Sequence, residues 1–233
     1  MTLPTLDTER LILRPRVRDD LEACLAMDRA PGVVRWVPGP WHDPIAHRAF
    51  VEARLAAVFP DGLGYWTVVE RAARDRFLGW VLLIPVDGIG PEIEIGWRLR
   101  PEVWGRGVAT EAAARLIAHA EALEIDQVIA DIHADNAASR RVAAKIGMVE
   151  ESPVERDGHA GFRYVARLSP RPTAHRPARR ALPEGRRDGE KGVPEAPIRT
   201  PSGGAAAARL MRPSSSVWFQ SAPPARGRRE CCR

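Results

Sequence analysis

Two glycines separate a strongly alternating segment from a long amphipathic one, and this junction limits the possible folds more than any other feature of the chain. Residues 92–99 begin by alternating carboxylate and isoleucine side chains, which is typical of a β-strand with two different faces. Residues 109–123 repeat alanine, leucine and isoleucine at helical spacing. Gly105 and Gly107 lie between the two segments. The sequence therefore predicts a strand, a tight turn and a helix in direct succession.

The predicted helix begins without a capping side chain. No Ser, Thr, Asp or Asn stands at its N-cap position, so its first N–H groups have no obvious side-chain partner. Free amides, the helix dipole and the small residues Gly107 and Ala109 together favour a bound anion such as a phosphate or pyrophosphate. A tight turn that merely requires glycine is the alternative. The turn lacks the Gly-Lys-Ser/Thr ending of a Walker A loop, and the strand before it does not begin a parallel βαβ unit.

The remaining apolar patterns predict an α/β domain whose first half is rich in antiparallel hairpins. Strands are expected at residues 11–15, 65–69, 77–84, 92–99, 128–132, 148–155 and 162–168. Besides 109–123, helices are expected to open at Asp19 and Asp20, at Pro44 and at Asn136. Val58 is expected on the apolar side of the second helix, and Gly147 should stop the last one.

The composition changes after residue 168. Residues 169–233 contain ten prolines, six glycines and few large apolar residues, so we expect a disordered tail. Residues 1–168 carry 21 Lys and Arg against 25 Asp and Glu, a net charge of −4, whereas the tail carries 14 against 5, a net charge of +9. Nucleic-acid binding is therefore expected, if at all, only through the tail. A solvated appendage and a read-through or frameshift product are the alternatives.

Cysteine usage and hydropathy exclude several classes of protein. Cys24 is isolated, and Cys231 and Cys232 are adjacent, so neither a disulfide framework nor a metal site can be formed from them. The longest apolar run, Trp80–Ile84, is far too short to span a membrane. The first ten residues contain no apolar secretory core. We therefore expect a cytoplasmic protein with no membrane partner and no bound metal.

Three motifs follow one another in a characteristic order. They are Glu-Ile-Gly-Trp at 94–97, Trp-Gly-Arg-Gly-Val-Ala-Thr-Glu-Ala at 104–112, and Asn-x-x-Ser-Arg with a later Lys-x-Gly at 136–147. This order resembles the GNAT superfamily of acetyl-CoA-dependent N-acetyltransferases. The opening Thr-Glu-Arg-Leu-x-Leu-Arg at 8–14 is similar to the RimJ/RimL-like branch. The resemblance covers residues 6–168 and implies a mixed α/β fold, whose mostly antiparallel sheet is splayed between its fourth and fifth strands.

The resemblance also implies where acetyl-CoA would bind. Pantetheine would lie in the splay and pair with the backbone of Trp97, Arg98 and Leu99. The pyrophosphate would lie on the glycine turn, on the backbone amides of Arg106, Gly107, Val108 and Ala109. Asn136 would hydrogen-bond the arm of the cofactor.

The chemistry of acetyl transfer needs a base, an oxyanion donor and an acid for the leaving thiolate. The family position favours Glu94 over Glu92 as the base, and a backbone N–H near Trp97 as the oxyanion donor. A solvated strand face is the alternative for both carboxylates. Ala143 occupies the position where many GNAT enzymes have a catalytic tyrosine, so the branch resemblance implies Ser139 as the acid. The alternative is that Asp135 or Asn136 merely caps a helix and Ser139 is a hydroxyl of its first turn.

The expected activity is transfer of acetyl from acetyl-CoA to a primary amine, by direct attack on the thioester. The acceptor is a protein N-terminus or a small-molecule amine, and the protein is a monomer or a homodimer. Family position places Trp36, Trp41 and residues 157–159 near the acceptor. His133 and His159 are expected to be surface or loop histidines. Arg14, Arg35 and Arg98 are expected to be surface charges, with contact to an acidic acceptor as the alternative. A non-catalytic acyl-CoA-binding module with a basic interaction tail is the alternative function.

Overall fold

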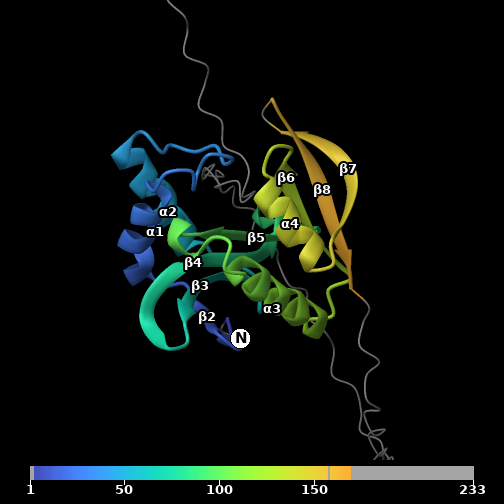
Figure 1. The fold of residues 1–233 in the computed structure, drawn as a ribbon, viewed down its shortest axis with the longest axis horizontal. Coiled ribbons are helices and arrows are strands. Elements are labelled where there is room, and N and C mark those ends of the chain that lie inside the picture. The colour runs from blue at the N-terminus through green and yellow to red at the C-terminus, as the bar shows by residue number, and fades with distance from the viewer. Residues whose placement is uncertain (1–2, 157, 169–233) are drawn as a thin grey trace, which may run out of the picture. The chain divides into compact units, whose positions relative to one another are not determined.

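A computed structural model describes residues 3–156 and 158–168. The tail predicted at 169–233 lies outside these residues. Within them, one eight-stranded sheet has the order β1-β2-β3-β4-β5-β6-β8-β7 (Figure 1). Its strands are β1 (Leu6–Asp7), β2 (Leu11–Pro15), β3 (Gly64–Glu70), β4 (Ala73–Pro85), β5 (Ile93–Leu99), β6 (Gln127–His133), β7 (Val149–Arg156) and β8 (His159–Arg167). The helices are α1 (Leu21–Asp28), α2 (Pro44–Ala56), α3 (Val108–Ala122) and α4 (Ala137–Lys145), with short 3₁₀ turns at Arg18–Asp20, Val86–Gly88 and Pro101–Val103.

The sheet opens between β5 and β6, the fourth and fifth of the strands expected from the sequence. These two strands run parallel and share a single registered pair, Glu94 with Ile129. By contrast, β4 and β5 are antiparallel and paired along seven positions. Every other pair of neighbouring strands described is antiparallel. The predicted splay of a mostly antiparallel sheet is therefore confirmed.

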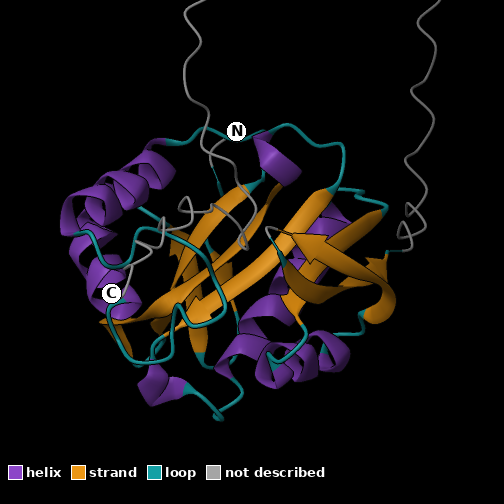
Figure 2. Ribbon diagram, turned by 90° about the horizontal axis from the view of Figure 1, so that it is seen from above, coloured by secondary structure: helices purple, strands orange, loops and turns teal. Residues whose placement is uncertain are grey.

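Helices cover the two faces of the sheet differently, and each face has its own core. On one face, α3 and the buried Ala143 of α4 pack against residues such as Val81 and Ile95. On the other face, α1 and α2 pack against Trp80, Leu82 and Ile84 of β4. Figure 1 shows α1 and α2 grouped together, well apart from α3 and α4, and Figure 2 shows the same separation from above. The opening between β5 and β6 therefore lies in a sheet that α3 and α4 cover on one face and α1 and α2 on the other.

Local sequence signals account for most helix ends. Asp43 caps α2 by accepting hydrogen bonds from the first-turn N–H groups of Ile45 and Ala46, and Pro44 occupies the first helical position as predicted. Gly147 follows α4 with a φ of +85°, as a helix stop requires. The expectation for Val58 is wrong, because α2 ends at Ala56 and the Val58 side chain is 94% exposed. No helix in the described part of the chain is long and apolar enough to cross a membrane.

Candidate functional site

A cavity of about 390 Å³ lies at the opening of the sheet. Its walls come from the loop after α1, the end of β5, the glycine turn, the first turn of α3 and the exposed side of α4. The predicted residues that line it are Trp97, Arg98, Leu99, Gly107, Val108, Ala109, Asn136 and Ser139. Arg106 and Glu94 are not among the lining residues. The structure thus brings most of the predicted cofactor site together around one cavity.

The charge of this cavity is one-sided. Arg35, Arg98, Arg141 and Lys145 line it, and among residues 3–156 and 158–168 no Asp or Glu does. Arg141 and Lys145 lie one turn apart on α4, so both face the same side of that helix. Such a wall suits a ligand that carries several negative charges.

The glycine turn leaves the start of α3 open to the cavity. Gly107 is the N-cap residue, has a left-handed φ of +78°, and no side chain caps the helix. Gly105 also has a positive φ, of +73°, and a Cβ there would meet nothing within 4 Å. The first-turn amides, including those of Val108 and Ala109, therefore have the orientation and freedom that an anion site at a helix N-terminus needs. The turn fits the pyrophosphate expected there.

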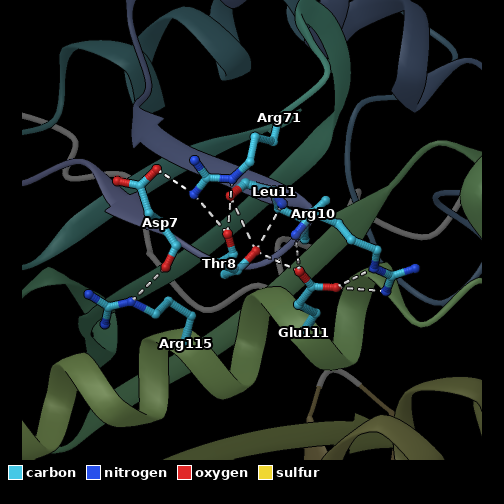
Figure 3. Close-up of polar contacts among 7 residues, drawn as sticks. All are labelled: Asp7, Thr8, Arg10, Leu11, Arg71, Glu111 and Arg115. Carbon is cyan, nitrogen blue, oxygen red and sulfur yellow. Dashed lines mark hydrogen bonds and ion pairs between the residues drawn. The ribbon is translucent and has the colours of Figure 1, made fainter.

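A polar network that the sequence did not suggest fixes the first turn of α3 to the N-terminal segment (Figure 3). Glu111 accepts hydrogen bonds from the Thr8 hydroxyl at 2.6 Å and from the backbone N–H and Nε of Arg10 at 2.9 and 2.7 Å. Arg10 also donates to the carbonyl of Arg106 at 3.2 Å. Burial acts to raise the pKa of Glu111, but these hydrogen bonds hold that pKa below its usual value. Glu111 is therefore an ionised anchor whose charge is paired with that of Arg10.

Trp97 and Ser139 meet across the cavity from β5 and α4. The indole N–H of Trp97 donates to the Ser139 hydroxyl oxygen at 3.3 Å. Asn136 caps α4, since its side-chain oxygen accepts from the Ser139 N–H at 3.1 Å. The capping alternative is thus correct for Asn136. Ser139 also lines the cavity, and its hydroxyl oxygen accepts the hydrogen bond from Trp97.

Glu94 faces the other side of the sheet. It pairs with Ile84 of β4, which packs with α1 and α2, and residues paired directly across antiparallel strands share a face. The Glu94 residue is only 5% exposed, so the alternative of a solvated strand face is wrong for it. Glu92 differs from Glu94, because its carboxylate forms an ion pair with the guanidinium of Arg163, with Nη1 and Oε1 2.9 Å apart. Arg163 also contacts Asp131, at 2.8 Å.

The expectation that Arg98 is a surface charge is wrong. Its residue is 9% exposed, and its guanidinium donates to Asp28 at 2.9 Å. The other oxygen of Asp28 contacts Nε2 of His47 at 3.1 Å. Burial acts to raise the pKa of Asp28, but Arg98 and His47 hold it below the usual value. This buried network joins α1 and α2 to the part of β5 that is predicted to hold pantetheine.

Of the residues expected near the acceptor, some line the cavity at the sheet opening and others do not. Trp36 lines the cavity and lies 4.7 Å from the His133 ring, which in turn lies 5.8 Å from that of His159. Trp41 does not line the cavity and packs instead against His47 and Phe50. Asp157 lies outside the described residues.

Arg14 and Arg35, two of the expected surface charges, have different partners in the structure. Arg14 is paired with Asp20, whereas Arg35 is exposed and stacks over the Trp36 ring at 4.5 Å. Among the residues that the structure describes, no group of three or more His, Cys, Asp or Glu could hold a metal ion.

A sheet that opens beside an uncapped helix start, over a cavity that no described acidic residue lines, suits an enzyme that transfers an acyl group from coenzyme A. Comparison with protein families identifies the group more closely. The model of the acetyltransferase (GNAT) domain matches residues 10–149, which is more than half of the chain. The chain belongs to the GNAT acetyltransferase family, whose members take the acetyl group from acetyl-CoA.

Individual relatives agree with this family. FsC-acetyl coenzyme A-N(2)-transacetylase of Aspergillus fumigatus is 32% identical over 62% of this chain, which spans 65% of the length of that relative. An acetyltransferase structure from Agrobacterium tumefaciens is 28% identical, with a TM-score of 0.60 over 72% of this chain and 96% of that one. RimL, a ribosomal L7/L12 alpha-N-protein acetyltransferase in complex with coenzyme A, is 16% identical, with a TM-score of 0.60 over 72% of this chain and 99% of that one. At that identity, the likeness to RimL concerns the fold alone.

Proposed function

We propose that this protein is an N-acetyltransferase that moves acetyl from acetyl-CoA to the primary amine of a protein N-terminus or a small molecule. The observation that carries the proposal is the meeting of the uncapped start of α3 with a cavity that no acidic residue of the described part of the chain lines. Acetyl-CoA brings several phosphate charges, and this wall offers amides and cations to them. The Thr-Glu-Arg-Leu segment at 8–11, bound to α3 through Glu111, supports a place in the RimJ/RimL-like branch.

In the proposed reaction the amine nitrogen attacks the thioester carbonyl carbon directly. Glu94, on the α1 and α2 side of the sheet, takes the proton that the amine loses. A backbone N–H near Trp97 stabilises the oxyanion, and Ser139 protonates the coenzyme A thiolate when the carbon–sulfur bond breaks. Burial raises the pKa of Cys24 to about 11, so this thiol is protonated near neutral pH and does not support an acyl-enzyme route.

The cofactor site can be tested with one substitution and a matched control. Gly107→Glu places a carboxylate at the uncapped helix start, and Gly147→Glu adds the same charge at an exposed glycine of similar φ. We expect calorimetric titration of the full chain with acetyl-CoA to show binding that Gly107→Glu weakens at least about tenfold, since like charges at a helix N-terminus repel. Gly147→Glu should bind as the wild type does. Equal affinity in all three proteins would contradict the proposed site.

A second measurement separates catalysis from binding alone. Release of coenzyme A would be followed with a panel of amines that includes N-terminal peptides and small polyamines. Amine-dependent release supports the enzyme and identifies the acceptor class. Tight acetyl-CoA binding without release for any amine would favour the alternative, a non-catalytic acyl-CoA-binding module.

A further inference from the structure

A second cavity, of about 260 Å³, lies where α2 ends and β3 begins. It shares no lining residue with the cavity at the sheet opening. Arg16, just after β2, and Arg54, in the last turn of α2, contribute its charged groups. The other described lining residues are mostly apolar, and none of them is acidic. Two guanidinium groups thus share a small cavity whose described lining includes no Asp or Glu.

Aromatic rings hold the two guanidinium groups in place. Arg16 stacks over the Tyr65 ring at 3.8 Å, and Arg54 stacks over the Phe50 ring at 3.6 Å. Arg16 also donates from Nη2 to the backbone carbonyl of Arg54 at 3.2 Å. These contacts fix the direction of the planar donors before any ligand arrives, which lowers the entropy lost on binding.

The hydrogen bonding of Arg16 is incomplete. Its Nε is buried and has no hydrogen-bond partner among the residues that the structure describes. Buried donors are nearly always satisfied, because an unsatisfied one loses its hydration without replacement. Burial lowers the pKa of the Arg16 guanidinium, and the charge of Arg54 lowers it further. Arg16 therefore bears an energetic penalty that an anion would relieve.

Arg14, Arg98 and Arg163 of the described chain each have a carboxylate partner. Arg14 donates to Asp20 at 2.8 Å, Arg98 to Asp28 at 2.9 Å and Arg163 to Asp131 at 2.8 Å. In these three cases the fold supplies the carboxylate itself. At Arg16 it supplies aromatic rings and a cavity in place of a carboxylate.

We propose that this second cavity binds a small oxyanion, a carboxylate or a phosphate, between Arg16 and Arg54. The planar guanidinium of Arg16 matches the geometry of either group. The bound anion would join the end of α2 to the end of β2 and would satisfy the buried Nε of Arg16. Its site is separate from the acetyl-CoA cavity, so the proposal stands whether or not that cavity has the proposed function.

The test follows the Arg16 Nε–Hε resonance of the full-length protein by NMR, at constant ionic strength, in separate titrations with inorganic phosphate and with butanoate. The resonance is assigned by its loss in Arg16→Gln, and anion binding to that variant is measured by thermal unfolding. We expect a saturable shift with at least one anion, and the stronger of the two identifies the preferred group. The anion should raise Tm in the wild type, and Arg16→Gln should need roughly tenfold more anion, or more, for the same rise.

Three controls make the outcome decisive. Arg18→Gln removes the same charge from an exposed position two residues away and should behave as the wild type. Arg16→Lys keeps the charge without the planar fork and should bind more weakly than wild type but better than Arg16→Gln. Gly107→Glu, which changes only the other cavity, should keep the shift. A shift that never saturates, an equal Tm response in Arg16→Gln, or loss of the shift in Gly107→Glu would overturn the proposal.

Discussion

At the scale of single residues, the proposed acid and base approach the sheet opening from opposite faces. Ser139 lies on the cavity wall and accepts from Trp97, whereas Glu94 is buried on the face where α1 and α2 pack. This separation suits a reaction in which the amine and the leaving thiolate lie on different sides of the carbonyl carbon. Each residue can therefore be removed without disturbing the other.

Glu94→Gln and Ser139→Ala should lower kcat while the affinity for acetyl-CoA stays close to that of the wild type. For Glu94→Gln we expect a loss of about 10²- to 10⁴-fold, as for other positioned bases, and a smaller loss for Ser139→Ala. Stopped assays of coenzyme A release give kcat, and calorimetry gives the affinity. An unchanged kcat in both variants would show that the assigned residues are wrong.

The local part of the site could be read from the sequence, and the long-range part could not. Gly107, Ala109 and Ser139 belong to short motifs whose order carries their meaning, and they line the cavity. Arg98 was assigned to the surface because its partner Asp28 lies 70 residues earlier in the chain. Pairing across that distance depends on how α1 packs against β5, which no local pattern records.

At the scale of secondary-structure elements, α3 is held at its first turn by the segment between β1 and β2. Glu111→Ala removes the acceptor for Thr8 and Arg10 (Figure 3). We expect the free energy of unfolding to fall by about 1–2 kcal/mol, because the Thr8 hydroxyl and two Arg10 donors lose their acceptor. Chemical denaturation measures this change. Glu121→Ala, near the other end of α3, is the control and should change the stability by less than about 0.5 kcal/mol.

A second network joins β2, β3 and α1 through Asp20. This carboxylate accepts from Arg14 at 2.8 Å, from the N–H of Val17 at 2.9 Å and from the hydroxyl of Thr67 at 2.7 Å. The residue was expected to open a helix, and it does precede α1, but its side chain makes no cap hydrogen bond to that helix. Burial acts to raise the pKa of Asp20, yet these partners hold it below its usual value.

Because the folded-state pKa of Asp20 is depressed, its ionised form stabilises the fold above the unfolded pKa, near 4, and this contribution is lost as the pH falls through the folded pKa. Asp20→Asn should therefore lower the stability by about 2–3 kcal/mol at pH 7, and by less as the pH falls below about 4. Thermal unfolding at several pH values measures the difference. Asp19→Asn, at the exposed neighbour, should leave the profile unchanged. A difference that does not depend on pH would contradict the assignment.

At the scale of the whole molecule, the family match and both cavities lie within the first 168 residues. A chain that ends at Leu168 should keep the acetyl-CoA affinity and the unfolding temperature of the full chain, which calorimetry and thermal unfolding can compare. A loss of either would place part of the functional domain in residues 169–233.

The element order could be predicted because each strand and helix carries its own period and end signals. The splay was implied by the resemblance to the family, because no local pattern records where two strands separate. Exposure at Val58 could not be predicted, because it depends on where α2 stops packing against the sheet.

The opening of the sheet between β5 and β6 has a consequence for the order of events. With the proposed roles, the acceptor binds beside Glu94, on the face of the sheet where α1 and α2 pack, and the coenzyme binds beside Ser139 of α4. Neither substrate needs to leave before the other enters, and neither product crosses the path of the other. With these roles, each turnover also collects a proton at Glu94, on one face of the sheet, and delivers one from Ser139, on the other face. Double-reciprocal plots of the initial rate for such an enzyme intersect, since both substrates are bound when the acetyl group is transferred.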